Sequence, residues 1–180
     1  MNLEEKYNYL NTVRGQPWLI REALKEYGTT EIVGPKHNTS IMAWSDDIGG
    51  WEKDYYSKDE IPWCGLFVAI ICKRSKKDIA KGFLGAKNWN KWGNKVDAGD
   101  EGLGDVLVFS RNGGGHVGFY VGEDTTHYHV LGGNQSDSVN IARIAKNRLF
   151  GIRRAEYNNK PKGVIKVILD ADGAVSTNES

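Results

Sequence analysis

Two cysteines lie in the stretch DEIPWCGLFVAIICK, residues 59–73, and the first stands where polar residues meet an apolar run. A cysteine becomes a nucleophile when its thiolate is stabilised, and the unpaired amides at the start of a helix do this. Pro62 precedes Cys64, and the apolar residues that follow fit a helix, so a thiol at a helix N-terminus is one interpretation. A small core residue is the other. Cys72, inside the apolar run, is expected to belong to the core.

A nucleophilic thiol also needs a base, and the chain has four histidines. His116 begins a predicted strand directly after RNGGG, where glycines let backbone or substrate come close. Gly115 in this turn is therefore a predicted substrate contact. His127 and His129 lie two residues apart and point the same way on one strand, and we expect both at the surface.

A third polar group commonly orients the ring of such a histidine. Asn134, in LGGNQS at the end of the next predicted strand, is the residue expected there, because a hairpin would set it beside His116. Gln135 is its nearest competitor. Asp105 fits less well, since GDVLVF has the pattern of a strand entry.

Helical patterns fill the first hundred residues, with an N-terminal helical part over 1–60. Helices are predicted over 17–28, over 38–50 with Asn38 or Ser40 as the cap, and from Cys64 to KRSKK. GAKNWNKWG is a short fourth helix or turn. The cations of KRSKK stand at the negative C-terminal end of the preceding helix, where positive charge is favourable. We favour this explanation of the charge run over nucleic-acid binding. The cations are Lys73, Arg74, Lys76 and Lys77.

From Gly104 the apolar pattern changes to a period of two, with turn clusters between five short strands. Helices followed by strands predict an α+β fold, with helices packed on a five- to six-stranded antiparallel sheet. Residues 1–155 would form one domain. Residues 156–180 would be an extension, with a possible strand in KGVIKVILDADG and a loose tail.

Net charge, apolar runs and the N-terminal residues limit the classes of function that the chain can have. The chain has 180 residues and a formal net charge of +1, so no global field attracts nucleic acid. Its longest apolar run has eight residues, far short of a membrane span. The N-terminus lacks a signal-peptide pattern, so we expect synthesis in the cytoplasm and export by another route. Cys64 and Cys72 are expected to remain free thiols.

The blocks PWCGLFV, GDVLVFSRNGGGHVGFYVG and YHVLGGNQSDSVNIARI, in this order, resemble CHAP-type cysteine peptidases and amidases of the papain-like superfamily. The resemblance is greatest to compact phage and prophage members, and it runs from about Pro17 to Arg154. It implies cleavage of amide bonds in bacterial peptidoglycan without a cofactor. Cys64 would be the nucleophile, His116 the base and Asn134 the orienting residue. Many members carry a Glu at the position of Gly132.

The same resemblance implies peptidoglycan as the partner. Beside it we expect Trp63, Gly115 and Gln135 as substrate contacts, with core packing as the alternative for Trp63. The chain would act on the cell wall as an endolysin, as a phage-particle component, or as a secreted antibacterial effector with a cognate immunity protein. No metal site is expected from its scattered aspartates. Two alternatives remain: a zinc peptidase that uses His116, His127 and His129, and a non-catalytic wall-binding module.

Overall fold

Six antiparallel strands form one sheet in the computed structural model, which describes residues 3–171. The order across the sheet is β1-β6-β2-β3-β4-β5, so the central strands follow one another as hairpins and β6 returns to lie beside β2. The strands are β1 (Asn94–Val96), β2 (Val106–Arg111), β3 (Gly114–Glu123), β4 (His127–Gly132), β5 (Asn140–Ala145) and β6 (Leu149–Arg154).

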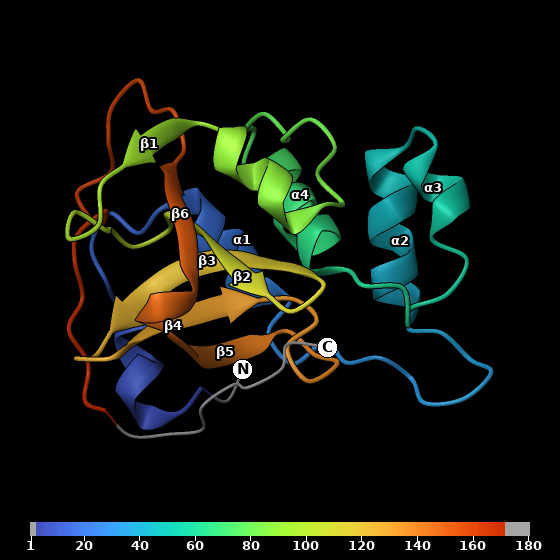
Figure 1. The fold of residues 1–180 in the computed structure, drawn as a ribbon, viewed down its shortest axis with the longest axis horizontal. Coiled ribbons are helices and arrows are strands. Elements are labelled where there is room, and N and C mark those ends of the chain that lie inside the picture. Colours follow the sequence, from blue (N-terminus) through green and yellow to red (C-terminus); the bar gives the residue numbers. More distant parts are fainter. Residues whose placement is uncertain (1–2, 172–180) are drawn as a thin grey trace.

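The helices gather on one face of this sheet, with α4 between the strands and the α2–α3 pair (Figure 1). Asn38 caps α2 by accepting from the backbone N–H groups of Ser40 and Ile41, and Gly28 follows α1 with a positive φ. The helices are η1 (Glu5–Asn11), α1 (Trp18–Lys25), α2 (Thr39–Ile48), α3 (Glu52–Tyr55), α4 (Cys64–Arg74), η2 (Ala86–Lys91) and η3 (Lys146–Arg148).

The main core lies between the helices and the inner face of the sheet. Every residue of α4 from Cys64 to Cys72 is buried, and Phe67 meets Phe119 of β3 with ring centroids 6.2 Å apart. A second apolar cluster covers the outer face, where Phe109 and Tyr120 pack against Tyr128. Apolar side chains thus cover both faces of β2 and β3, and β3 carries His116 of the candidate site.

The predicted α+β class is confirmed, with helices first and an antiparallel sheet after them. Four short elements were not predicted: η1, α3, η3 and the three-residue β1, which lack the length to show a period. Residues 163–169 form no named strand. They run beside the end of β3, where Ile168 makes an isolated bridge to Glu123. The predicted loose tail lies outside the described residues.

Candidate active site

Cys64 is the first residue of α4, where the sequence analysis placed it, and 9% of its surface is exposed, against none for Cys72. Its thiol lies near the backbone N–H groups of Val117, Gly65 and Cys64 itself, which favour the thiolate. β4 pairs with β3 only from Phe119 onward. The N–H of Val117 therefore lies beyond the end of that ladder, at the point where α4 meets the sheet.

His116 immediately precedes Val117, so its Cα lies about 3.8 Å along the chain from the residue that contacts the thiol. His116 is 1% exposed, and its ring nitrogen Nε2 lies 2.9 Å from Oε1 of Gln135. The fold thus brings the predicted nucleophile next to the segment of β3 that carries the predicted base. They come from α4 and β3, 52 residues apart in the sequence.

The amide of Gln135 fixes which nitrogen of His116 carries the proton. Its Nε2 donates to the carbonyl oxygen of Val130 at 3.1 Å, and to the carbonyl oxygen and Oδ1 of Asn140 at 2.8 and 3.0 Å. With the NH₂ group occupied on that side, Oε1 must face His116 and accept from it. A neutral His116 then carries its proton on Nε2, which leaves the lone pair on Nδ1 to act as a base.

The double glycine of LGGNQS makes room on both sides of the chain. A Cβ on Gly132 would lie 2.7 Å from Oε1 of Gln135 and 3.2 Å from Nε2 of His116. A Cβ on Gly133 would lie 2.6 Å from atoms of Trp63 and Phe67, on the side of α4. Because Gly132 has no side chain, the side chain of Gln135 can occupy the space beside it.

Asn134 and Gln135 have different places in the structure. Asn134 adopts a left-handed backbone, with φ of +55°, in the turn that follows β4. That turn brings Gln135, 1% exposed, to the His116 ring. The hydrogen bond therefore favours Gln135 as the orienting residue over Asn134. Gln135 does not serve as the predicted substrate contact, because its side chain is hydrogen-bonded to groups inside the protein.

The other two predicted substrate contacts also differ from each other. Trp63 is fully buried, packs on Trp44 and donates from Nε1 to Glu31 at 2.6 Å, so its ring forms no open groove wall. Gly115 is half-buried beside η2, and a Cβ there would lie 3.0 Å from the carbonyl oxygen of Phe109. A close approach at Gly115 is therefore present as predicted, but the group that comes close is the backbone of Phe109 and not a substrate.

Two side chains near the thiol were not found from the sequence. Tyr56 is 2% exposed and donates to the carbonyl oxygen of Pro62 at 2.7 Å. Burial and the nearby Cys64 raise its pKa, so it remains a hydrogen-bond donor. Arg111, at the end of β2, is the other. Neither position carries a local signal, because both are set by how loops and strands meet in space.

Opposing effects set the acidity of Cys64. Burial raises the pKa of its thiol, while the N–H of Val117, the positive charge of Arg111 and the amides at the helix start act to lower it. The net direction is upward, so the thiol needs a proton acceptor to react near neutral pH. His116, the residue before Val117 on β3, is the candidate for that acceptor.

Changing Arg111 to methionine is expected to raise the pKa of Cys64 further, because the favourable charge is lost while burial stays. The rate of alkylation by iodoacetamide, followed by mass spectrometry against pH, should then rise at higher pH than in the wild type. Arg111→Lys keeps the charge and serves as the control. Identical profiles for the methionine variant and the wild type would show that Arg111 does not act on the thiol.

His129 is part of a buried polar cluster, and the prediction of a surface position for it was wrong. Its Nε2 donates to Asp124 at 3.1 Å, and its Nδ1 accepts from the hydroxyl of Tyr7 at 2.7 Å. Arg143 completes the cluster by donating to the same Asp124 oxygen at 2.9 Å. His127, two residues before His129 on β4, is half-buried, and its Nδ1 lies 2.8 Å from the hydroxyl oxygen of Thr126.

Acid is expected to destabilise the protein through this cluster. Burial lowers the pKa of His129, against the pull of Asp124, so the folded protein holds it neutral. An unfolded histidine titrates at a pKa of about 6.5. As the pH falls below that value, the unfolded chain binds a proton that the folded chain resists, and the free energy of unfolding drops.

Thermal unfolding between about pH 7.5 and pH 5.5 tests this expectation. His129→Gln should lower Tm overall and flatten its dependence on pH over that range. His127→Gln, on the same strand, should leave the dependence unchanged. An unaltered dependence in His129→Gln would assign the effect to another group.

The described residues do not support the three-histidine zinc site. Both ring nitrogens of His129 are engaged within the protein, and it pairs across from Gly122, six residues along β3 from His116. Within residues 3–171, the grouping of side chains that could hold a metal ion is His37, Asp59 and Glu60. Asp59 already accepts from two backbone N–H groups there and lies 3.0 Å from His37, which stabilises the loop before α2.

Comparison with models of known protein families gave no match for this chain, and comparison with curated proteins gave none either. Along the described part of the chain, none of the helices is both long and apolar enough to cross a bilayer.

Proposed function

We propose that this protein is a cysteine peptidase or amidase with a papain-like fold of the CHAP type, and that it cleaves amide bonds of bacterial peptidoglycan. The observation that carries the proposal is the position of the Cys64 thiol. It lies at the start of α4 against the N–H of Val117, next to a histidine whose other ring nitrogen is held by Gln135. The order of motifs along the chain supports the choice of family and substrate.

In the proposed reaction, Nδ1 of His116 takes the proton of Cys64 as the sulfur attacks the carbonyl carbon of the substrate amide. The tetrahedral intermediate places negative charge on the carbonyl oxygen. The backbone N–H groups at the start of α4 are suited to stabilise that charge. His116 then gives its proton to the leaving amine, and the C–N bond breaks to leave a thioester on Cys64.

Water completes the cycle. His116 removes a proton from a water molecule, the hydroxide attacks the thioester, and the carboxylic acid leaves as the thiol is regenerated. Throughout, Gln135 keeps the proton of His116 on Nε2, so that the basic nitrogen faces the thiol. Gln135 acts here as a positioning residue. In this proposal the protein acts on the wall from the periplasmic or outer side, after export or as part of a phage particle.

Mass spectrometry of purified peptidoglycan after incubation with the protein tests the proposal. Release of defined muropeptides is expected, and their masses identify the bond that is cut. Treatment with a chelator should leave the release unchanged. Loss of activity on chelation would favour a metal-dependent peptidase, and tight binding without release would favour a wall-binding module.

A further inference from the structure

Three hollows follow one another around the C-terminal end of α4, away from Cys64. The first, about 600 Å³, lies among residues 79–82 and 88–93. The second, about 180 Å³, shares Trp92 and Gly93 with the first, and the third, about 270 Å³, shares Lys76 with the second. Because neighbouring hollows share lining residues, they lie next to one another on this side of the molecule, and we call the three together the basic groove.

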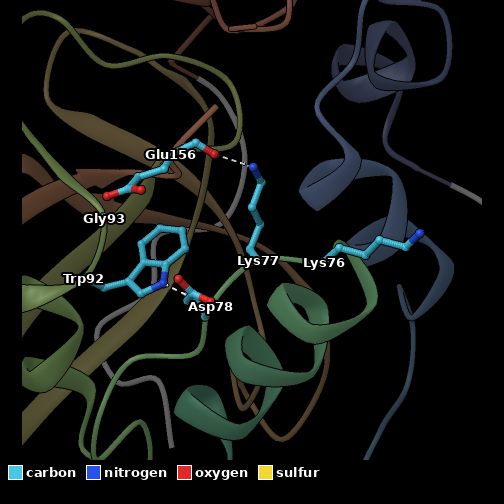
Figure 2. Close-up of a pocket in the computed structure, with 6 residues that line it drawn as sticks. All are labelled: Lys76, Lys77, Asp78, Trp92, Gly93 and Glu156. Carbon is cyan, nitrogen blue, oxygen red and sulfur yellow. Dashed lines mark hydrogen bonds between the residues drawn. The ribbon is translucent and has the colours of Figure 1, made fainter. Parts of the chain in front are cut away.

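The walls of the basic groove are fixed by hydrogen bonds. Trp92 donates from its indole nitrogen to the carbonyl oxygen of Asp78 at 2.7 Å (Figure 2). Trp89, packed edge to face on Trp92, donates in the same way to Phe83 at 2.9 Å. Asn88 donates to the carbonyl oxygen of Gly82 at 2.7 Å. A groove held in this way exists before a ligand arrives, which lowers the entropic cost of binding.

Cations outnumber acidic groups along the basic groove. Its acidic residues are Asp78 and Glu156, both exposed. The cations that line it are Arg74, Lys76, Lys77, Lys81 and Lys91. Within residues 3–171, none of the four lysines forms an ion pair with a carboxylate, whereas Arg74 pairs with Glu26. Lys77 donates to the backbone oxygen of Glu156, and Lys76 points away from Trp92 toward the third hollow (Figure 2).

The dipole of α4 explains only part of this arrangement. Cations just after the last turn of a helix are favourable there, and Lys76 and Lys77 fit that role. Lys81 and Lys91 belong to the following loop and to η2, beyond the reach of the dipole. Ser75 lines the third hollow and also lacks a partner. Its Oγ is buried and has no hydrogen-bond partner within the described residues.

We propose that the basic groove binds a linear polyol-phosphate chain of the cell wall, an inference that rests on the proposed function because it takes the wall as the target. Cations spaced along an extended groove match a polymer with one negative charge per repeat better than a single anion. Nucleic acid is disfavoured because its single strands bind on successive exposed rings. Of the two tryptophans that line the basic groove, Trp92 is only 7% exposed and Trp18 is 59% exposed with Arg21 over its ring, so the groove offers one exposed ring and not a succession of them.

Binding of soluble poly(glycerol phosphate) to the full chain tests the proposal, with Cys64→Ala as the background so that no hydrolysis intervenes. The double variant Lys81→Glu, Lys91→Glu should bind about tenfold more weakly or worse. The double variant Lys36→Glu, Lys162→Glu changes the net charge equally at exposed positions outside the basic groove. Its affinity should stay close to that of the background protein, and added salt should weaken binding in both proteins.

Three results would overturn the proposal: equal losses in the two double variants, no loss in either, or equally tight binding of single-stranded DNA that is lost in the groove variant. Hydrolysis is measured separately, on peptidoglycan stripped of phosphate polymers. There the groove variant with Cys64 intact should match the wild type. Binding without any hydrolysis would therefore contradict the proposed function and leave the groove proposal standing.

Discussion

Replacing Cys64 by alanine is expected to lower the rate of peptidoglycan cleavage by about ten-thousandfold or more, because the covalent route through the thioester is lost. Substrate binding should persist, since the N–H groups at the start of α4 and the walls around it remain. The measurement is muropeptide release per unit time by mass spectrometry. With the wild type, rapid quenching should also trap a single acyl adduct on the protein.

Cys72 provides the matched control for this prediction. It lies on the same helix, is fully buried and has a pKa raised by burial, so its thiol is inert. Cys72→Ala should retain wild-type activity while losing stability on the order of 1 kcal/mol. Equal activity in the wild type and Cys64→Ala would make Cys64 structural as well.

The thiol of Cys64 is more buried than a reactive cysteine usually is, and this bears on how it reacts. Only 9% of its surface is exposed, and burial makes the isolated thiolate costly. In the proposed mechanism, the charged state becomes favourable when the proton passes to His116 and the two charges form a pair. Reactivity should consequently depend on the state of His116 more than on that of the thiol alone.

Hydrophobic periodicity and caps predicted the larger elements of the fold. The apolar run after Pro62 could form a helix only by burying nearly all its length, which placed Cys64 at the junction between core and rim. The strand periods from Gly104 onward predicted the hairpins of the sheet. Local patterns do not give the order of strands that are distant in the sequence, so the return of β6 to β2 and its pairing with β1 could not be predicted.

Residues whose environment depends on distant contacts escaped prediction. His129 was expected at the surface because strand alternation pairs it with His127. It is buried because Tyr7, from η1, packs against it across 122 residues of sequence. The third residue of the site raised a different difficulty. Strand alternation ends with β4 at Gly132, and the left-handed backbone of Asn134 turns the chain, so the pattern cannot say which side chain beyond it reaches His116.

Replacing Gln135 by leucine is expected to lower the rate of cleavage by about a hundred- to ten-thousandfold, the range seen when the partner of a catalytic histidine is lost. Leucine is of similar size but offers no acceptor to Nε2 of His116. The proton can then move to Nδ1, which removes the lone pair that acts as the base in the proposed mechanism. The loss should appear in kcat more than in KM, because the substrate itself is not contacted.

Two further variants separate positioning from folding. Gln135→Glu keeps an acceptor for His116 but loses the NH₂ donors to Val130 and Asn140, so it should be less stable than the wild type yet more active than Gln135→Leu. Its negative charge should also raise the pKa of His116 and shift the pH profile of activity upward, an effect that a merely structural role would not produce. Asn134→Gly keeps the left-handed turn and should remain within a few-fold of wild-type activity. If Asn134→Gly lost activity while Gln135→Leu retained it, Asn134 would be the orienting residue after all.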